Sequence, residues 1–137
     1  MKRLHVSLSV KDLQQSVEFY KHLFDAAPTV IKEDYAKWML DDPLVNFAIN
    51  SGGKQMGLQH LGIQVENEDE LQEVYQNFGN TEGELLEEGH TVCCYAQSEK
   101  SWVKDPQGVE WEAFHTYGTS EVKKVSDTQC CEDTCCA

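Results

Sequence analysis

The sequence has little positive charge and no long hydrophobic run. Its 137 residues include 24 acidic residues and only 11 Lys or Arg residues, which gives a net charge of −13. An acidic surface of this kind disfavours binding to nucleic acid and to anionic membranes. No apolar stretch is long enough for a transmembrane helix, and the opening residues, MKRLHVSLSV, contain no signal-peptide core. We therefore expect one soluble, cytoplasmic domain.

The cysteines lack the spacing of zinc fingers. All six occur as adjacent pairs, at 93–94, 130–131 and 135–136, whereas zinc fingers usually place two to four residues between ligands. Without a secretion signal, thiols are expected rather than a disulfide framework. Adjacent cysteines in a strand point to opposite faces and can hardly bridge each other without strain. A single cysteine is often a small core residue, but three adjacent pairs indicate a function for the thiols.

What the sequence does contain is an internal repeat. The alternating segment LHVSLSV (4–10) precedes the helical pattern DLQQSVEFYKHLF (12–24), and QHLGIQV (59–65) precedes DELQEVYQNF (69–78). Alternation is typical of a half-buried strand, and the apolar residues of each second segment fall on one helical face. Each half therefore begins with a strand followed by an amphipathic helix. The predicted N-caps are Asp12 for the first helix and Asn67 or Asp69 for the second.

Short strands are predicted after each helix. In the first half they are PTVIKED, KWMLDD and VNFAINS, with turns at DDP and SGGK. In the second half they are GELLEEG, HTVCCYA, KSWVKDP and GVEWEAFHTY, with turn signals at EEGH and DPQG. The first half thus consists of a strand, a helix and three strands, and the second half, with four short segments after its helix, is interpreted in the same way. This predicts two βαβββ modules at about 1–53 and 55–118.

Two histidines occupy equivalent places in the halves, because each is the second residue of its opening strand. His5 shares a strand face with two serines, and the intervening apolar residues form the opposite face. In the last strand, Glu112 and the apolar residue Trp111 also lie on opposite faces. Since helices should cover the apolar faces, His5, His60 and Glu112 should all point away from the helices. A lone strand histidine is usually structural, but two histidines at equivalent repeat positions together with the acid predict a metal site.

Two βαβββ modules in about 118 residues resemble the vicinal oxygen chelate superfamily, which includes glyoxalase I, extradiol dioxygenases and bleomycin-resistance proteins. The resemblance implies an α+β fold in which both modules form one cup-shaped mixed sheet with a metal at its floor. LHV and QHLGI match the opening-strand histidines of the superfamily, and DPQGVEWEAF matches its final strand. The resemblance therefore implies that His5, His60 and Glu112 are the metal ligands.

The repeat also predicts the number of ligands. Aligning the DP turns of the halves, with Gly108 as a one-residue insertion, pairs Glu112 with Ala48. Four-ligand members such as glyoxalase I carry a glutamate at the position of Ala48. Two histidines and one carboxylate leave coordination positions open, which suits non-haem Fe(II) and oxygen chemistry. We therefore expect Fe(II) as the cofactor.

The paired thiols indicate a particular branch of this superfamily. Soft thiolates favour soft partners such as Cu(I), Zn(II), Cd(II) or trivalent arsenic, and two thiolates can replace both exchangeable oxygens of a trivalent organoarsenical. The sequence resembles the Fe(II)-dependent carbon–arsenic lyases and, more loosely, the cadmium-induced proteins. This implies that Cys93 and Cys94 are catalytic, arsenic-binding residues. It also implies dioxygen-dependent release of arsenite from methylarsenite and trivalent aromatic arsenicals.

Because side chains of neighbouring strand residues diverge, we expect 90–100 to depart from strand geometry around the cysteine pair, as a bulge or a mobile loop over the mouth of the cup. The nearby AQSEKS (96–101) is polar and compatible with a loop. The segment 119–137 has too few apolar residues for a core and is expected to be a flexible tail. Its thiols are candidates for arsenic capture, the alternative being a tail with incidental thiols: Cys130, Cys131, Cys135, Cys136. Candidate pocket walls or core residues are Tyr35, Tyr95, Trp102 and Phe114. Candidates for supporting the ligands or moving protons are His90, His115 and Tyr117.

Two other interpretations remain open. One is a different enzyme of the same fold, either a glyoxalase-like isomerase or an extradiol dioxygenase, although neither explains the cysteine pairs. The other is a non-catalytic resistance protein that sequesters arsenic, cadmium or an antibiotic. The expected partners are a small organoarsenical and O2, and the chain is expected to be a monomer or a homodimer.

Overall fold

The computed structural model describes residues 1–81, 83, 85–93 and 96–119. The first module contains β1 (Arg3–Val10), α1 (Leu13–Phe24), β2 (Val30–Ile31), β3 (Tyr35–Asp41) and β4 (Leu44–Ser51). The second contains β5 (Gly57–Val65), α2 (Glu68–Asn80), β6 (Leu85–Cys93), β7 (Ala96–Lys104) and β8 (Glu110–Thr119). Each module therefore has the predicted βαβββ order.

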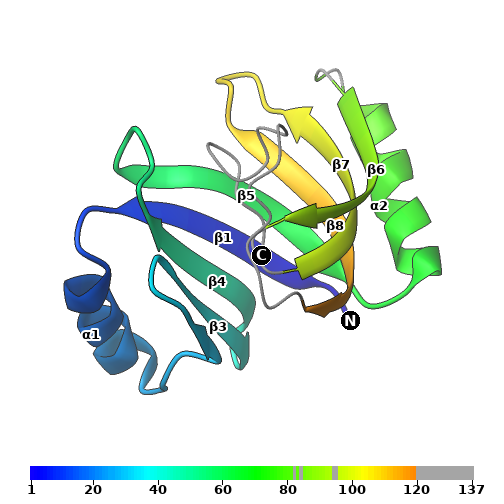
Figure 1. Cartoon of the computed structure of the whole chain (residues 1–137). Helices are drawn as coiled ribbons and strands as arrows, with labels where there is room; N and C mark the ends of the chain where they lie inside the picture. The colour runs from blue at the N-terminus through cyan, green and yellow to red at the C-terminus, as the bar shows by residue number, and fades with distance from the viewer. Residues whose placement is uncertain (82, 84, 94–95, 120–137) are drawn as a thin grey trace.

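All the strands belong to one eight-stranded sheet with the order β2-β3-β4-β1-β5-β8-β7-β6. The opening strands β1 and β5 lie side by side at its centre and run antiparallel, while each pairs in parallel with the last strand of its own module. The sheet curls between α1 at one end and α2 at the other, both on its outer side (Figure 1). The predicted cup-shaped mixed sheet is confirmed.

Each helix packs on its own half of the sheet through the predicted face. In α1, Val17 and its apolar neighbours at helical spacing pack with Trp38 and Phe47. In α2, Leu71 and Val74 pack with residues of β5, β7 and β8. The two separate apolar clusters lie on the helix side, so the opposite face of the sheet is left to the polar residues of the strands.

The helix starts agree with the capping chemistry in the sequence. The Asp12 carboxylate accepts a hydrogen bond from the Gln15 backbone N–H at 3.1 Å. The Asn67 side chain accepts one from the Glu70 N–H at 2.8 Å, so Asn67 rather than Asp69 caps α2. Neither described helix has the length and apolar content needed to cross a membrane.

The second module differs from the prediction in its hairpin. Residues 85–93, which belong to the two expected strands GELLEEG and HTVCCYA, form the single strand β6, and the expected turn at EEGH is instead a register shift between Glu87 and Gly89. The expected loop at 96–101 is also wrong, because β7 begins at Ala96 and pairs with both β6 and β8. Pairing on both sides satisfies the backbone whatever the polarity of the side chains. Of the expected flexible tail, 119–137, the first residue Thr119 instead ends β8, and 120–137 lie outside the described residues.

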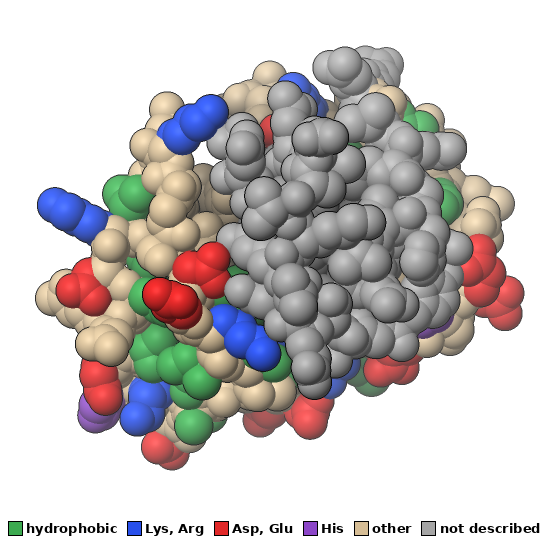
Figure 2. Space-filling view, viewed as in Figure 1, with side chains coloured by type: hydrophobic (Ala, Val, Ile, Leu, Met, Phe, Trp, Pro, Cys, Tyr) green, Lys and Arg blue, Asp and Glu red, His purple; other side chains and the backbone are tan. Residues whose placement is uncertain are grey.

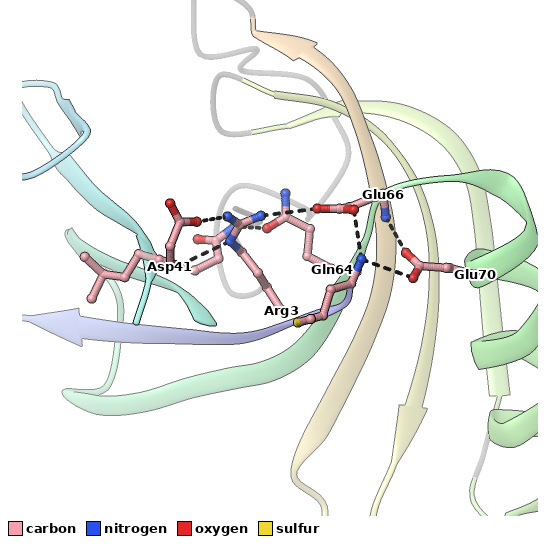
Figure 3. Close-up of polar contacts among 8 residues, drawn as sticks. Arg3, Asp41, Gln64, Glu66 and Glu70 are labelled. Atoms are coloured by element: carbon pink, nitrogen blue, oxygen red, sulfur yellow. Dashed lines mark hydrogen bonds and ion pairs between the residues drawn. The ribbon is translucent and has the colours of Figure 1, made fainter. Parts of the chain in front are cut away.

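Ion pairs join the modules at the N-terminal edge of the sheet. The Arg3 guanidinium bonds to the Leu40 carbonyl and to Asp41, and it lies 3.9 Å from Glu66 (Figure 3). The terminal amine lies 2.8 Å from Glu66 and 3.4 Å from Glu70. Most of these groups are exposed, so each pair contributes little. Figure 2 shows acidic side chains at several separate places on one face of the protein.

Candidate metal centre

Three neighbouring strands bring the predicted ligands together. His5 Nε2 lies 3.0 Å from His60 Nε2, and His60 Nε2 lies 3.1 Å from Glu112 Oε2. The ligand atoms of all three residues lie within 4.8 Å of one another, and each residue is 0 % exposed. In the part of the chain that the structure describes, no other group of this kind is found. The expectation that both histidines could reach one ion is confirmed.

The distances fit a single divalent cation. Ligand atoms ~2.1 Å from one ion and at right angles to each other would be ~3.0 Å apart. The observed separations of 3.0 and 3.1 Å would therefore suit neighbouring ligands of one ion held by His5, His60 and Glu112. A buried carboxylate beside two imidazoles is also a site where a cation would compensate the charge.

The protonation of His5 supports the same reading. Its Nδ1 lies 3.1 Å from the Asn46 carbonyl oxygen, which can only accept, so Nδ1 carries the proton and donates. The neutral imidazole then presents a lone pair at Nε2, the atom that faces His60 and the site. Metal-ligating histidines usually donate their other nitrogen in this way. The second histidine differs, because His60 Nδ1 has no hydrogen-bond partner among the described residues.

A glycine makes room for the cluster. Gly62 lies on the central ligand strand β5, next to Glu112 in the β5–β8 ladder and next to His5 in the β1–β5 ladder. A Cβ at this position would lie 2.7 Å from the Glu112 carbonyl oxygen and 3.3 Å from His5 Cδ2. Any larger residue would therefore push the ligands apart. The sequence placed Gly62 on the face of His60, but the need for glycine comes from packing between strands.

Aromatic rings hold both histidines in place. Phe114 meets the His5 ring edge-on at 5.2 Å between centroids, and Trp102 meets His60 in the same way at 5.1 Å. Tyr35 is buried on β3, where it pairs with Asn50 rather than with a ligand strand. The described contacts therefore bring two of the candidate wall residues, Trp102 and Phe114, to the ligands.

The remaining candidates are not assigned to the site by the described contacts. Tyr95 lies outside the described residues, as do the side chains of His90 and Tyr117. His115 lies on β8, the strand that carries Glu112, where it pairs with Val65. Its side chain belongs to the face of the sheet opposite to that of Glu112. A role for these residues in proton transfer stays a prediction.

The strand register confirms the correspondence between Ala48 and Glu112. Glu112 pairs with Gly62, two residues after His60. Ala48 pairs with Ser7, two residues after His5. The two positions are therefore equivalent in the repeat, and the first module offers a buried methyl group where the second offers a carboxylate.

Polar residues that the sequence analysis missed bond to one another on the strands around the ligands. The Asn46 side-chain amide donates to Gln64 Oε1 at 3.0 Å, in the group of contacts drawn in Figure 3. Gln59 occupies a bulge between β1 and β5, and its Oε1 accepts bonds from Ser7 and Asn50, both at 2.9 Å. The alternation within VNFAINS already placed both asparagines with Ala48 on one face, which is the signal that could have found them.

The first cysteine of the predicted arsenic-binding pair lies at the end of β6, where the β6–β7 hairpin turns. Cys93 is the last residue of β6 and pairs with Ala96, while Cys94 lies outside the described residues. Cys93 follows Leu86, which pairs with Trp102, by seven residues, or ~23 Å of regular strand. The register shifts at 87–89 and 97–98 are places where the hairpin can bend.

The chain is similar to proteins whose names concern arsenic and cadmium. It is 42% identical over 137 residues to a "Trivalent organoarsenical cleaving enzyme" from Bacillus sp. (strain MD1), covering 96% of this chain and 83% of that protein. It is 32% identical over 124 residues to the "Cadmium-induced protein CadI" of Mycobacterium bovis (strain ATCC BAA-935 / AF2122/97), covering 88% of this chain and 80% of the relative.

Solved structures show the same fold at low sequence identity. An extradiol ring-cleaving dioxygenase from B. fuscum matches with a TM-score of 0.62 and 17% identity, over 88% of this chain and 34% of that one. The model of one family, described as "Glyoxalase/Bleomycin resistance protein/Dioxygenase superfamily", matches residues 2–113. The paired modules, the buried ligand cluster and these similarities agree, and the chain belongs to the glyoxalase/bleomycin resistance protein/dioxygenase superfamily.

Proposed function

We propose that this protein is an enzyme that cleaves the carbon–arsenic bond of trivalent organoarsenicals and releases arsenite, in a reaction that depends on Fe(II) and O2. The observation that carries the proposal is the buried cluster of two histidines and one glutamate, with Ala48 at the position equivalent to the glutamate in the other module. The 42% identical relative named as an organoarsenical cleaving enzyme supports the substrate class. Methylarsenite and trivalent aromatic arsenicals are the proposed substrates.

His5, His60 and Glu112 are the proposed metal ligands. Two histidines and a carboxylate are typical of non-haem Fe(II) oxygenases. When bound, Fe(II) supplies open coordination positions and the redox chemistry needed to use O2. The protein fixes the ligand geometry through the Asn46 carbonyl and the two aromatic contacts. Burial of all three ligands keeps bulk water away from the site.

Cys93 and Cys94 are the proposed arsenic-binding residues. Their thiolates replace the two exchangeable oxygens of the substrate, so that the organic group is the remaining substituent on arsenic. Since Cys93 ends β6 at the hairpin tip, bending of the hairpin toward the cup brings the carbon–arsenic bond to the metal site and excludes water. The tail cysteines, 130, 131, 135 and 136, are proposed to capture arsenic before this transfer. The proposed setting is the cytoplasm, where thiols stay reduced.

A binding protein without turnover is the second candidate. The 32% identity to a cadmium-induced protein and the adjacent thiols favour it, because a thiol pair can sequester a soft metal ion without catalysis. A glyoxalase-like activity is less well supported, since Ala48 removes the fourth ligand. An extradiol activity leaves the cysteine pairs without a role.

One experiment separates these candidates. The protein is reconstituted with Fe(II) under anaerobic conditions and mixed with methylarsenite, and arsenite is measured before and after O2 is admitted. Release of arsenite only with both Fe(II) and O2 is the expected result. Zn(II)-loaded protein is the control, because Zn(II) is not redox-active. Retention of intact methylarsenite under every condition would instead indicate a sequestering protein.

A further inference from the structure

The indole N–H groups of two buried tryptophans, Trp38 and Trp102, differ in whether they have a hydrogen-bond acceptor. Trp38 is 0 % exposed, and its Nε1 donates to the Ala26 carbonyl oxygen at 2.9 Å. Trp102 is 5 % exposed, and its buried Nε1 has no hydrogen-bond partner among the described residues. An indole N–H can only donate, so Trp102 needs an acceptor that these residues do not supply. Buried donors without acceptors are rare in native proteins, and bound ligands are one explanation of them.

The position of Trp102 indicates where such an acceptor would come from. Trp102 pairs with Glu112 in the β7–β8 ladder, so both side chains project from the same face of the sheet. Its ring also packs edge-on against His60. The next residue, Val103, belongs to the apolar cluster under α2, which leaves Trp102 on the opposite, polar face. The unpaired donor therefore belongs to a ring in contact with the candidate metal ligands.

The repeat shows that this donor is particular to the second module. Trp102 is paired with Glu112 as Lys37 is paired with Ala48, so Lys37 is its counterpart in the first module. Trp102 thus lies beside the carboxylate ligand Glu112, whereas Lys37 lies beside Ala48 at the equivalent position. This pairing ties the indole to the metal-binding half of the cup rather than to the general architecture of the sheet.

We propose that Trp102 donates its indole N–H to a small ligand held at the open position of the metal site. The ligand class is a small molecule or anion that presents an unprotonated oxygen or nitrogen atom. Under the proposed function, Trp102 thereby orients a small acceptor at the site, beyond any role as a wall of the pocket. The inference rests on the proposed metal site, but it does not depend on which organoarsenical is the substrate.

Azide binding to Co(II)-substituted protein tests the proposal, because azide offers nitrogen acceptors and Co(II) absorption changes with coordination. Trp102→Phe keeps an aromatic ring beside His60 and removes the N–H. Since a hydrogen bond to a charged acceptor is worth more than a neutral one, the Kd for azide should rise about 10-fold or more. Trp38→Phe is the matched control, since it removes a buried indole N–H from the helix side. Its azide Kd and Co(II) content should stay at the wild-type values.

An NMR measurement on the unmodified chain makes the test independent of the folding of Trp102→Phe. In 15N-labelled Zn(II)-loaded protein, azide should shift the Trp102 indole N–H resonance downfield and leave that of Trp38 in place. An unmoved Trp102 resonance, or an unchanged azide Kd in Trp102→Phe with full Co(II) content, would overturn the proposal. Wild-type protein that binds Co(II) but not azide would refute both the open position and this hydrogen bond. An intact azide response without arsenite release would refute the proposed reaction alone.

Discussion

The two modules share one plan of strands and helices, yet they contribute unequally to the site. The first supplies His5 and, at the equivalent of the carboxylate position, Ala48. The second supplies His60, Glu112 and the indole of Trp102. A repeated fold thus places matched positions around one centre, and single side chains at those positions decide how many ligands the ion receives. In the proposed metal site, this inequality of the halves would leave the ion with room for other ligands.

The largest effect is expected when the contribution of the second module is removed. His60→Ala should lose tight metal binding and lower activity by more than ~100-fold, since loss of a residue that merely supports a ligand already costs ~10–100-fold. Metal content by elemental analysis and arsenite release are the two readouts. His22→Ala is the control, because His22 is a largely exposed histidine on α1 and should leave both unchanged. Full activity in His60→Ala would refute the metal site.

The hairpin of the second module should be needed for turnover and not for metal binding. Cys93→Ser and Cys94→Ser should each abolish arsenite release, because the hydroxyl does not replace a thiolate as a ligand for arsenic. Iron content should stay at one per chain, since His5, His60 and Glu112 are untouched. Deleting residues 119–137 should reduce activity only modestly. Active single serine variants together with an inactive truncation would move arsenic capture to the tail.

Making the halves alike should fill one of the open coordination positions. Ala48→Glu places a second carboxylate at the equivalent of Glu112, so the metal should still bind while O2-dependent turnover falls by at least about 10-fold. Because Ala48 is fully buried, the larger side chain should also cost ~1–3 kcal/mol of unfolding free energy. Ala48→Val is the control for overpacking without a carboxylate. Equal losses of turnover in both variants would mean that crowding, rather than a fourth ligand, is responsible.

Much of the difference between the two modules could be predicted from the sequence. The alternation within each strand shows which residues share a face of the sheet, and the repeat shows which residues of the two modules are equivalent. Alternation put His5, His60 and Glu112 on the face that the structure shows, and the repeat paired Glu112 with Ala48, while the resemblance to the superfamily placed their strands side by side. The packing faces of both helices and the cap at Asp12 also followed from spacing.

Other features depended on which strands meet, and the sequence could not predict them. Gly62 is required because a Cβ would contact a strand that lies about 50 residues further along the chain. The bulge that turns Gln59 toward Ser7 and Asn50 depends on the β1–β5 register. The strand character of 96–101 was missed because polar composition indicated a loop, although pairing on both sides decides the backbone conformation.

Gly62→Ala should show how much the close packing between the ligand strands contributes to stability and to metal binding. The added Cβ would lie 2.7 Å from backbone oxygen, which should cost ~1–3 kcal/mol of unfolding free energy and weaken metal binding. Gly79→Ala is the matched control, because the structure gives its Cβ no neighbour within 4 Å and the residue lies in α2. That change should stabilise the protein by ~0.5–1 kcal/mol. Urea unfolding measures both, and the two changes are expected to have opposite signs.

The smallest expected effect concerns the starts of the two helices. The third helical position holds Glu70 in α2 and Gln15 in α1, three residues after each cap. The backbone N–H of Glu66 bonds to the Glu70 carboxylate at 2.9 Å. This bond, followed by the nearby terminal amine, lowers the pKa of Glu70 below its usual value of 4.5. A carboxylate with a lowered pKa in the folded state adds stability above pH 4.5, and that stability is lost as the pH falls through the folded-state pKa.

Glu70→Gln makes the start of α2 resemble that of α1 and should remove this pH dependence. The variant should be slightly less stable than the wild type at pH 7, and the difference should shrink as the pH falls below 4.5, because the wild-type carboxylate then takes up its proton. Urea unfolding of both proteins at pH 7 and at several values below 4.5 measures the difference. Gln15→Glu is the reciprocal variant and should gain stability near neutral pH, since it adds a negative charge at the N-terminus of α1. A stability difference between wild type and Glu70→Gln that stays constant with pH would show that Glu70 acts through its shape rather than its charge.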